Sequence, residues 1–187
     1  MKMPVLSLCM GYKSMEKYVF KPYNPIWPKL FMRECERIKR NIFWAINIEH
    51  IGSTAVPGLG GKGIIDIAIA AGKEDLERTA KVLQEFLGYV FRESGSTIER
   101  LFFRIDLPDE EEGMRRYHVH LSFAESSEWR DLILFRDYLR DHSEEVQRYA
   151  ELKKDLVDQV RGDGGLYRKH KAPFFEEVLK KAQKGWG

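Results

Sequence analysis

The sequence predicts one α/β (α+β) domain in which helices flank a mixed β-sheet and a helical extension forms the C-terminal part. Three observations support this prediction. The apolar run at 64–70 is typical of a strand buried on both faces. Three strand-like segments joined by short loops of turn residues follow it, which indicates antiparallel hairpins. From about residue 125 onward the pattern is helical. Because strands precede this helical part, the order of elements indicates an α/β or α+β domain and not a helical bundle.

Composition narrows the class further. The chain has 187 residues, of which 43% are hydrophobic and 32% charged, as in an ordinary globular protein and unlike a disordered or collagen-like chain. A net charge of +2 gives no strong nucleic-acid signal, although a local basic pocket is compatible with it. No apolar run reaches the ~18 residues that span a bilayer, so we expect no membrane partner. Cys9 and Cys35 are interpreted as free thiols in the cytoplasm.

The elements are justified in chain order. Residues 1–17 show no clear pattern and are expected to form a flexible N-terminal arm. The proline-containing turn at 23–28 starts a helix, and apolar residues spaced by three or four predict that it continues to about Trp44. The other expected elements are strands over 46–51 and 64–70, a helix over about 76–87, strands over 89–93, 98–107 and 115–123, and helices over about 127–141, 143–161 and 172–184.

These elements predict a single domain over 18–187, with a core at about 18–124 and a helical extension at about 125–187. The sheet is expected to have four to six strands, with helices on one main face. The strand at 64–70 should lie at its centre, beside the strand at 46–51, because its continuous apolar run requires burial on both faces.

The glycine-rich segment at 52–63 is the most informative part of the sequence. Backbone N–H groups at a Gly52-Ser53 turn can point together at an anion, and the Ser53 hydroxyl adds a donor. Lys62 lies between this segment and Asp66, whose carboxylate on an apolar strand needs a partner or a cation. Together they indicate a phosphate site with a metal ion. The alternative is a loop chosen for its turn geometry, with Asp66 capping the backbone or pairing with Lys62.

His118 and His120 form a second candidate cluster. Histidines two residues apart on a strand point the same way, and neutral imidazole is a ligand for Zn²⁺, Mn²⁺ or iron. Together with Asp66 they predict a metal site. The alternative is a partly exposed histidine pair on a polar sheet face. His50 is a possible fourth group and is equally well interpreted as a packed, hydrogen-bonded side chain.

Other basic and aromatic residues are secondary candidates. Lys171 shares a helix face with Tyr167 and is a candidate to fold over a phosphate pocket, the alternative being a solvated charge. Arginines near the hairpins are interpreted as solvated charges, and the tryptophans and a phenylalanine pair as core: Arg100, Arg104, Arg115, Trp27, Trp44, Trp129, Phe102 and Phe103.

Several motifs follow one another in a fixed order. They are the runs at 23–28, 50–58 (His-Ile-Gly-Ser-Thr-Ala-Val-Pro-Gly), 62–67, 118–121, 129–130, 134–140 and 149–153, then Tyr167, Lys171 and Phe174. In these motifs, over about residues 18–183, the sequence resembles the GrpB-like family, which is described as part of the nucleotidyltransferase-fold superfamily.

The resemblance implies a nucleotidyltransferase-like fold in which Gly52 and Ser53 hold nucleotide phosphates. It also implies that Asp66 is the first acid of an Asp-x-Asp pair that binds a divalent metal ion, Mg²⁺ or a transition metal. The second position is Ala68, which departs from that pattern. A third acid, which activates the acceptor hydroxyl in the superfamily, is not evident, and His118 or His120 could take its place.

Three hypotheses remain. The first is an enzyme that transfers a nucleotidyl or phosphoryl group from a nucleoside triphosphate to an unknown small acceptor, assisted by a metal ion. The second, favoured by Ala68, is a non-catalytic nucleotide-binding or regulatory module. The third is an interaction domain with structural histidines. Fusions of some family members with dephospho-CoA kinase suggest nucleotide or coenzyme A metabolism.

Overall fold

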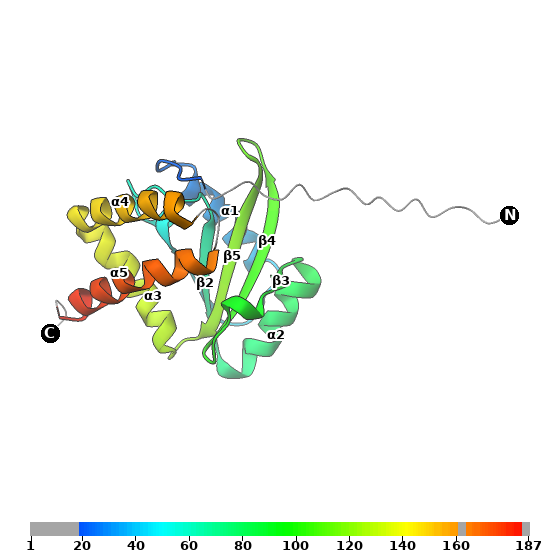
Figure 1. Cartoon of the computed structure of the whole chain (residues 1–187). Helices are drawn as coiled ribbons and strands as arrows, with labels where there is room; N and C mark the ends of the chain where they lie inside the picture. Colours follow the sequence, from blue (N-terminus) through cyan, green and yellow to red (C-terminus); the bar gives the residue numbers. More distant parts are fainter. Residues whose placement is uncertain (1–18, 161–163, 185–187) are drawn as a thin grey trace.

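Five strands form one mixed sheet in the order β1-β2-β5-β4-β3 (Figure 1). The computed structural model describes residues 19–160 and 164–184, so the predicted arm at 1–17 lies outside the described residues. Only β2 and β5 pair in parallel among the described strands, and the other neighbours are antiparallel. The strands are β1 (Ile46–Ile51), β2 (Ile65–Ala71), β3 (Val90–Phe91), β4 (Arg100–Asp109) and β5 (Gly113–Phe123).

Strand β2 lies between β1 and β5, as its apolar run predicted. Ile65, Ile67 and Ile69 are fully buried on one face, and Ala68 and Ala70 are buried on the other. Burial on both faces explains why the run is continuously apolar rather than alternating. Asp66 is the exception within β2, and it lies at the start of the strand.

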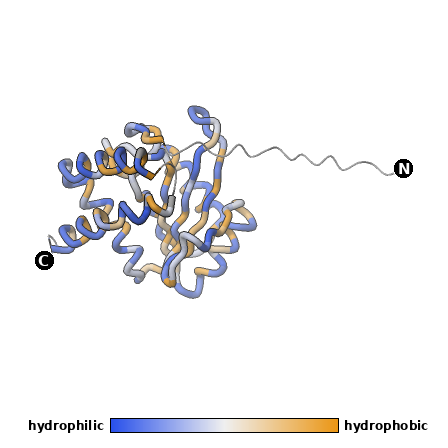
Figure 2. Tube along the Cα trace, viewed as in Figure 1, coloured by the Kyte–Doolittle hydropathy of each residue, from blue (hydrophilic) through white to orange (hydrophobic). Residues whose placement is uncertain are grey.

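Helices cover both faces of the sheet, so the expectation of one main face was wrong. α1 (Trp27–Lys39) and α2 (Leu76–Lys81) pack on the isoleucines of β2. α3 (Ser127–Asp141), α4 (Ser143–Val160) and α5 (Gly164–Lys184) lie on the other side and form a second core of their own. The small side chains of Ala68 and Ala70 allow α3 to approach this second face. Figure 2 shows hydrophobic segments where helices meet the sheet and one another.

Three helix boundaries differ from the prediction. The helix expected over about 76–87 is α2 as far as Lys81 and continues as a π-helical turn, Val82–Phe86. α1 ends at Lys39 instead of Trp44, because the Asn41 side chain donates to the Arg37 carbonyl at 2.9 Å and takes the place of a helical partner. Ile42 is still buried in the core, which explains why the apolar spacing continues past the helix end. α5 begins at Gly164 rather than 172 and runs through Pro173. No helix in the described ranges is long and apolar enough to cross a membrane.

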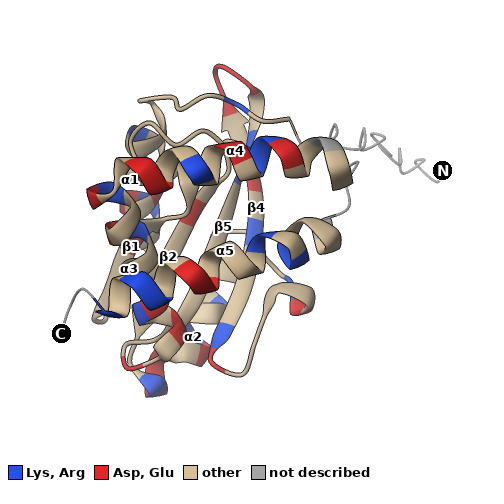
Figure 3. Ribbon diagram, turned by 60° about the vertical axis from the view of Figure 1, so that its left-hand side comes forward, with Lys and Arg blue, Asp and Glu red and all other residues tan. Residues whose placement is uncertain are grey.

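The hairpin of β4 and β5 is tied to the glycine-rich segment by Arg115. This arginine was interpreted as a solvated charge, but its side chain is 1% exposed. It donates to Asp109 at 2.8 Å and to the Gly63 carbonyl at 2.9 Å. The acidic residues of this hairpin gather at its tip, far along the strands from α5 (Figure 3). Arg115 therefore acts as a structural link between the hairpin and the segment that precedes β2.

Candidate functional site

A cleft of about 470 Å³ lies between the polar face of the sheet and the three C-terminal helices. It is lined by the residues that the sequence singled out for a phosphate or metal site, apart from His50: Gly52, Ser53, Lys62, Asp66, His118, His120 and Lys171. The topology explains why they meet. The glycine-rich segment joins β1 to β2, and β5 lies beside β2 in the sheet. Helix α5 covers the space above them.

The strand register brings Asp66 and the two histidines together. In the parallel pairing of β2 and β5, Asp66 is opposite His118 and Ala68 is opposite His120. Asp66 Oδ1 lies 3.1 Å from His118 Nδ1 and 3.8 Å from His120 Nε2. The neighbours Tyr117, Val119 and Leu121 are buried on the opposite face, as alternation along a strand requires.

The charge state of this group follows from its surroundings. Burial by itself would raise the pKa of the Asp66 carboxyl, but the hydrogen bond with His118 and the proximity of His120 outweigh it and hold the pKa well below its usual range. Burial lowers the pKa of His120. We conclude that Asp66 is a carboxylate and His120 a neutral imidazole at neutral pH.

Gly52 is in direct contact with this carboxylate. Its backbone has φ 71° and ψ −170°, a conformation that residues other than glycine rarely adopt. A Cβ built at this position would lie 2.5 Å from Asp66 Oδ2. The turn that begins at Gly52 is therefore specified both by backbone conformation and by the approach to Asp66, and Ser53 follows it in a short 3₁₀ turn, Ser53–Ala55.

Lys153 is a site residue that the sequence analysis missed. It lies on α4, and its side chain is almost completely buried at 2% exposed. Its Nζ donates to Ser53 Oγ at 2.9 Å and to the Gly60 carbonyl. A signal was present in the sequence, because Lys153 follows Tyr149 by four residues and precedes Leu156 by three, within the apolar stripe of the helix.

Lys153 belongs to a group of three lysines, Lys62, Lys153 and Lys171, which we call the lysine cluster. Burial, followed by the charge of Lys171, lowers the pKa of Lys153 to about 6 and that of Lys62 to about 7. The Nζ of Lys62 lies 3.7 Å from the centroid of the Tyr167 ring on α5. Amines gathered in one cleft disfavour each other's charged forms, and a bound anion would favour their protonation, so the lysine cluster is suited to an anionic ligand.

The far side of the cleft is lined by Arg92, Arg100, Phe102 and Arg104, which we call the arginine edge. Phe102 was expected in the core together with Phe103, but alternate residues of a strand face opposite sides. Phe103 is fully buried in the core, whereas the Phe102 ring lies 4.9 Å from His118 and 5.0 Å from His120 between ring centroids. The arginines line a cleft rather than open solvent.

His50 lies outside the cleft. It is buried, stacked on Phe31 at 4.6 Å between ring centroids, and hydrogen-bonded to Thr54 Oγ1 at 3.0 Å. Burial lowers the pKa of His50 to about 4, so the imidazole is neutral. Of its two interpretations, the packed, hydrogen-bonded histidine describes this structure. It lines a second cavity of about 560 Å³ on the other side of the glycine-rich turn.

The described residues give no support for the metal site predicted at Asp66, His118 and His120. No group of three or more His, Cys, Asp or Glu side chains in residues 19–160 and 164–184 is placed to hold a metal ion. His118 Nδ1 is hydrogen-bonded to Asp66, and Ala68 supplies no oxygen where a second carboxylate would be needed. The metal site at Asp66, His118 and His120 therefore stays a prediction.

Comparison with known proteins identifies the family. Residues 17–181 match the family model described as GrpB protein. The chain belongs to the GrpB family. This confirms the resemblance inferred from the motifs, and the five-stranded mixed sheet flanked by helices confirms the predicted fold class.

Relatives extend the comparison. A UPF0157 protein of Pseudomonas aeruginosa is 36% identical over 86% of this chain and 66% of its own length. One from Halalkalibacterium halodurans is 33% identical over 86% of this chain and 80% of its own length. The chain also resembles the crystal structure of the conserved protein GrpB from Enterococcus faecalis, with a TM-score of 0.74 and 28% identity. The match covers 90% of this chain and 100% of the Enterococcus faecalis chain. A dephospho-CoA kinase of Mycolicibacterium paratuberculosis is 23% identical over 86% of this chain and 45% of its own length.

Proposed function

We propose that this GrpB-family protein binds the phosphates of a nucleoside triphosphate at the lysine cluster and transfers a nucleotidyl or phosphoryl group to a small acceptor. The observation that carries the proposal is the buried Lys153, which donates to Ser53 in the turn after Gly52. The charged form of a buried amine is costly unless it has a partner of opposite charge. Within the lysine cluster, a bound phosphate would supply that charge to three amines together.

The charge of the cleft favours such a ligand. Eight Lys and Arg side chains line it against one acid, Asp66, although the whole chain has a net charge of only +2. Convergent cations in a partly enclosed cleft attract and hold polyanions. The 23% identical relative named dephospho-CoA kinase also favours a nucleotide-related activity.

The Asp66–His118 pair supplies a group for the transfer step. With the Nδ1 proton of His118 donated to Asp66, the Nε2 nitrogen is free to accept a proton. The acceptor hydroxyl oxygen would bond to a phosphorus of the triphosphate as the bond to the departing phosphate oxygen breaks. The hydroxyl proton would pass to His118, which Asp66 orients. Asp66 itself is a weak base, because its pKa lies well below the usual range.

A non-catalytic nucleotide-binding module is the second candidate, and Ala68 favours it. This residue is fully buried opposite His120, so no carboxylate stands two residues after Asp66. Sites that transfer phosphoryl groups through two metal ions require several carboxylates. An interaction domain with structural histidines is less favoured, because His118 and His120 line a cleft.

A thermal-shift panel tests the proposal. ATP should raise the melting temperature, and adenosine should not, because the phosphates provide the contacts. Lys171→Met should weaken ATP binding about tenfold, the value of one charge-assisted hydrogen bond. Lys81→Met is the matched control, since Lys81 lies exposed on α2 on the opposite face of the sheet and pairs with Glu77.

Each outcome of the panel has a defined meaning. No stabilisation by ATP, with or without Mg²⁺, would contradict the proposal. Stabilisation that requires Mg²⁺ would favour transfer and the predicted divalent ion, here brought by the nucleotide. Stabilisation without a metal ion, together with no turnover of ATP, would favour the binding module.

A further inference from the structure

The side chains of the arginine edge are ordered by contacts with neighbouring residues. Arg100 and Arg104 lie on β4 an even number of residues apart, so they share the face of the sheet that carries His118 and His120. The Glu93–Gly95 turn packs directly on Phe102, because a Cβ at Gly95 would overlap the Phe102 ring. Arg100 is held in place by Glu128 at 2.8 Å and by the Gly95 carbonyl at 3.3 Å.

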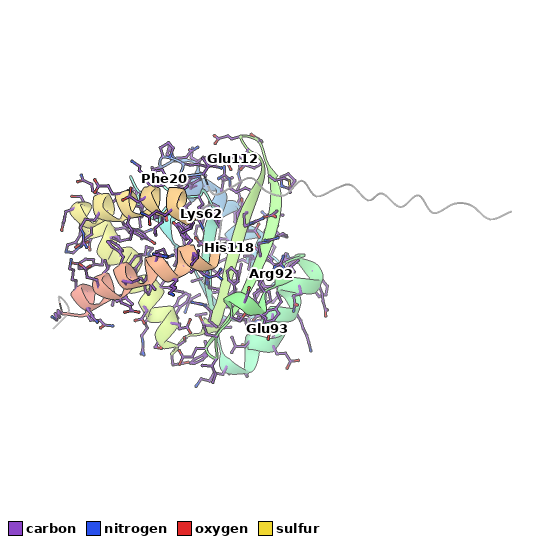
Figure 4. All side chains as sticks on the ribbon, in the orientation of Figure 1. Phe20, Lys62, Arg92, Glu93, Glu112 and His118 are labelled. Carbon is purple, nitrogen blue, oxygen red and sulfur yellow. The ribbon has the colours of Figure 1, made fainter. Side chains whose placement is uncertain are left out.

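The arginine edge lies on the opposite side of Asp66 from the glycine-rich turn. Asp66, His118 and Arg104 are opposite one another on β2, β5 and β4, which places Asp66 and Arg104 roughly 10 Å apart across the sheet. Ser53 and Lys62 belong to the segment between β1 and β2, on the other side. In the view of Figure 4, His118 lies between Lys62 and Arg92. The Asp66–His118 pair thus stands between two basic regions.

Buried polar atoms without partners gather beside the arginine edge. Four buried side-chain atoms lack a hydrogen-bond partner in the described part of the chain, and three of them are Arg100 Nε, His120 Nδ1 and Ser122 Oγ. Ser122 is directly opposite Arg100, and His120 is opposite Phe102. All three side chains lie on the cleft face of the sheet. Buried polar groups are normally satisfied, so such a cluster indicates that oxygen atoms of a ligand or of water complete it.

We propose that the arginine edge binds the acceptor of the transfer reaction and that this acceptor is itself an anion, a small hydroxylated molecule with a phosphate or carboxylate group. The proposal rests on the proposed function, which assigns the triphosphate to the lysine cluster. The forked guanidinium donors of Arg104 match the oxygens of either group, and Arg100, which Glu128 and Gly95 hold beside it, adds its positive charge and its unpartnered Nε. An anion held there would place a neighbouring hydroxyl near His118, between the two basic regions.

Three probes with the same carbon skeleton test the inference: ribose 5-phosphate, ribonate and ribose. Each is titrated into ¹⁵N-labelled protein saturated with ATP, and amide shifts are followed. We expect saturable binding of ribose 5-phosphate or ribonate, with shifts over residues 92–104, and no saturable binding of ribose. Whichever anion binds more tightly identifies the phosphate or the carboxylate as the preferred group.

Variants locate the binding. Arg104→Gln should weaken binding of the anion at least fivefold while changing ATP affinity less than twofold. Arg40→Gln, at an exposed residue just after the end of α1, should change neither affinity. Arg104→Lys, which keeps the charge and loses the fork, replaces Arg104→Gln if that variant does not fold. Absence of anion binding, or an equal loss of ATP affinity in Arg104→Gln, would overturn the inference. Anion binding that needs Arg104 in a protein that binds no ATP would instead overturn the proposed function and leave this subsite standing.

Discussion

We expect the substitution Gly52→Ala to abolish ATP binding and to lower the free energy of unfolding by roughly 1–3 kcal/mol, the usual cost of a residue held in a sparsely populated backbone conformation. Two causes act together. Alanine is strained at φ 71° and ψ −170°, and its Cβ would lie 2.5 Å from Asp66 Oδ2. Relief of that overlap must move either the turn that carries Ser53 or the Asp66 carboxylate, and both line the cleft.

Gly58→Ala separates these two causes. Gly58 also has a positive φ, 79°, but nothing lies within 4 Å of a Cβ at that position. The Gly58→Ala variant should therefore lose stability through backbone strain alone and keep its affinity for ATP. Urea unfolding and calorimetric titration with ATP measure both quantities in the two variants. Equal ATP affinity in wild type and Gly52→Ala would show that this turn does not hold the phosphates.

The second large effect is expected for Lys153→Met, which should weaken ATP binding roughly ten- to hundredfold, the range of a charge-assisted hydrogen bond. Methionine has a similar length, and it removes the amine that would become charged beside a bound phosphate without opening a large cavity. Lys154→Met is the matched control, because Lys154 is the next residue on α4 and its side chain is exposed. Retained ATP affinity in Lys153→Met would remove Lys153 from the proposed phosphate site.

The stability of Lys153→Met should differ from that of the wild type in a pH-dependent way. The pKa of Lys153 is lowered from 10.5 to about 6 in the folded protein. Between these values the unfolded chain carries a proton on Lys153 that the folded chain lacks. The free energy of unfolding of the wild type therefore rises with pH over this window, by at most about 1.4 kcal/mol per pH unit from this group.

Methionine cannot titrate, so Lys153→Met should lack this part of the pH dependence. The difference in the free energy of unfolding between wild type and variant should shift in favour of the wild type as the pH rises from about 6 toward 10. Denaturant unfolding at a series of pH values measures it, with Lys154→Met as the reference. Parallel curves for wild type and Lys153→Met would show that Lys153 is protonated in the folded protein.

Much of the fold was predictable because local patterns and the global fold agree. The apolar run at 64–70 identified β2 as a central strand, and its neighbour at 46–51 was correctly placed beside it. The prediction was less accurate where packing replaced local pattern. Ile42 continues a helical spacing after α1 has ended, because a buried residue beyond a helix end packs in the same core. The last helix was predicted to begin at about residue 172, yet α5 begins at Gly164 and includes Pro173.

The sequence by itself determined that Gly52, Ser53, Lys62, Asp66, His118, His120 and Lys171 are candidate site residues, because their residue types and spacing are local properties. Only the tertiary structure decided that they share one cleft, since the parallel pairing of β2 with β5 and the packing of α5 depend on contacts between distant segments. The same contacts brought Lys153 to Ser53, a hundred residues away, and turned Arg100 and Arg104 into one wall of the cleft. Residue type and spacing indicate which chemistry a side chain can perform. Its charge state and its partners depend on burial and on neighbouring groups, which only the fold supplies.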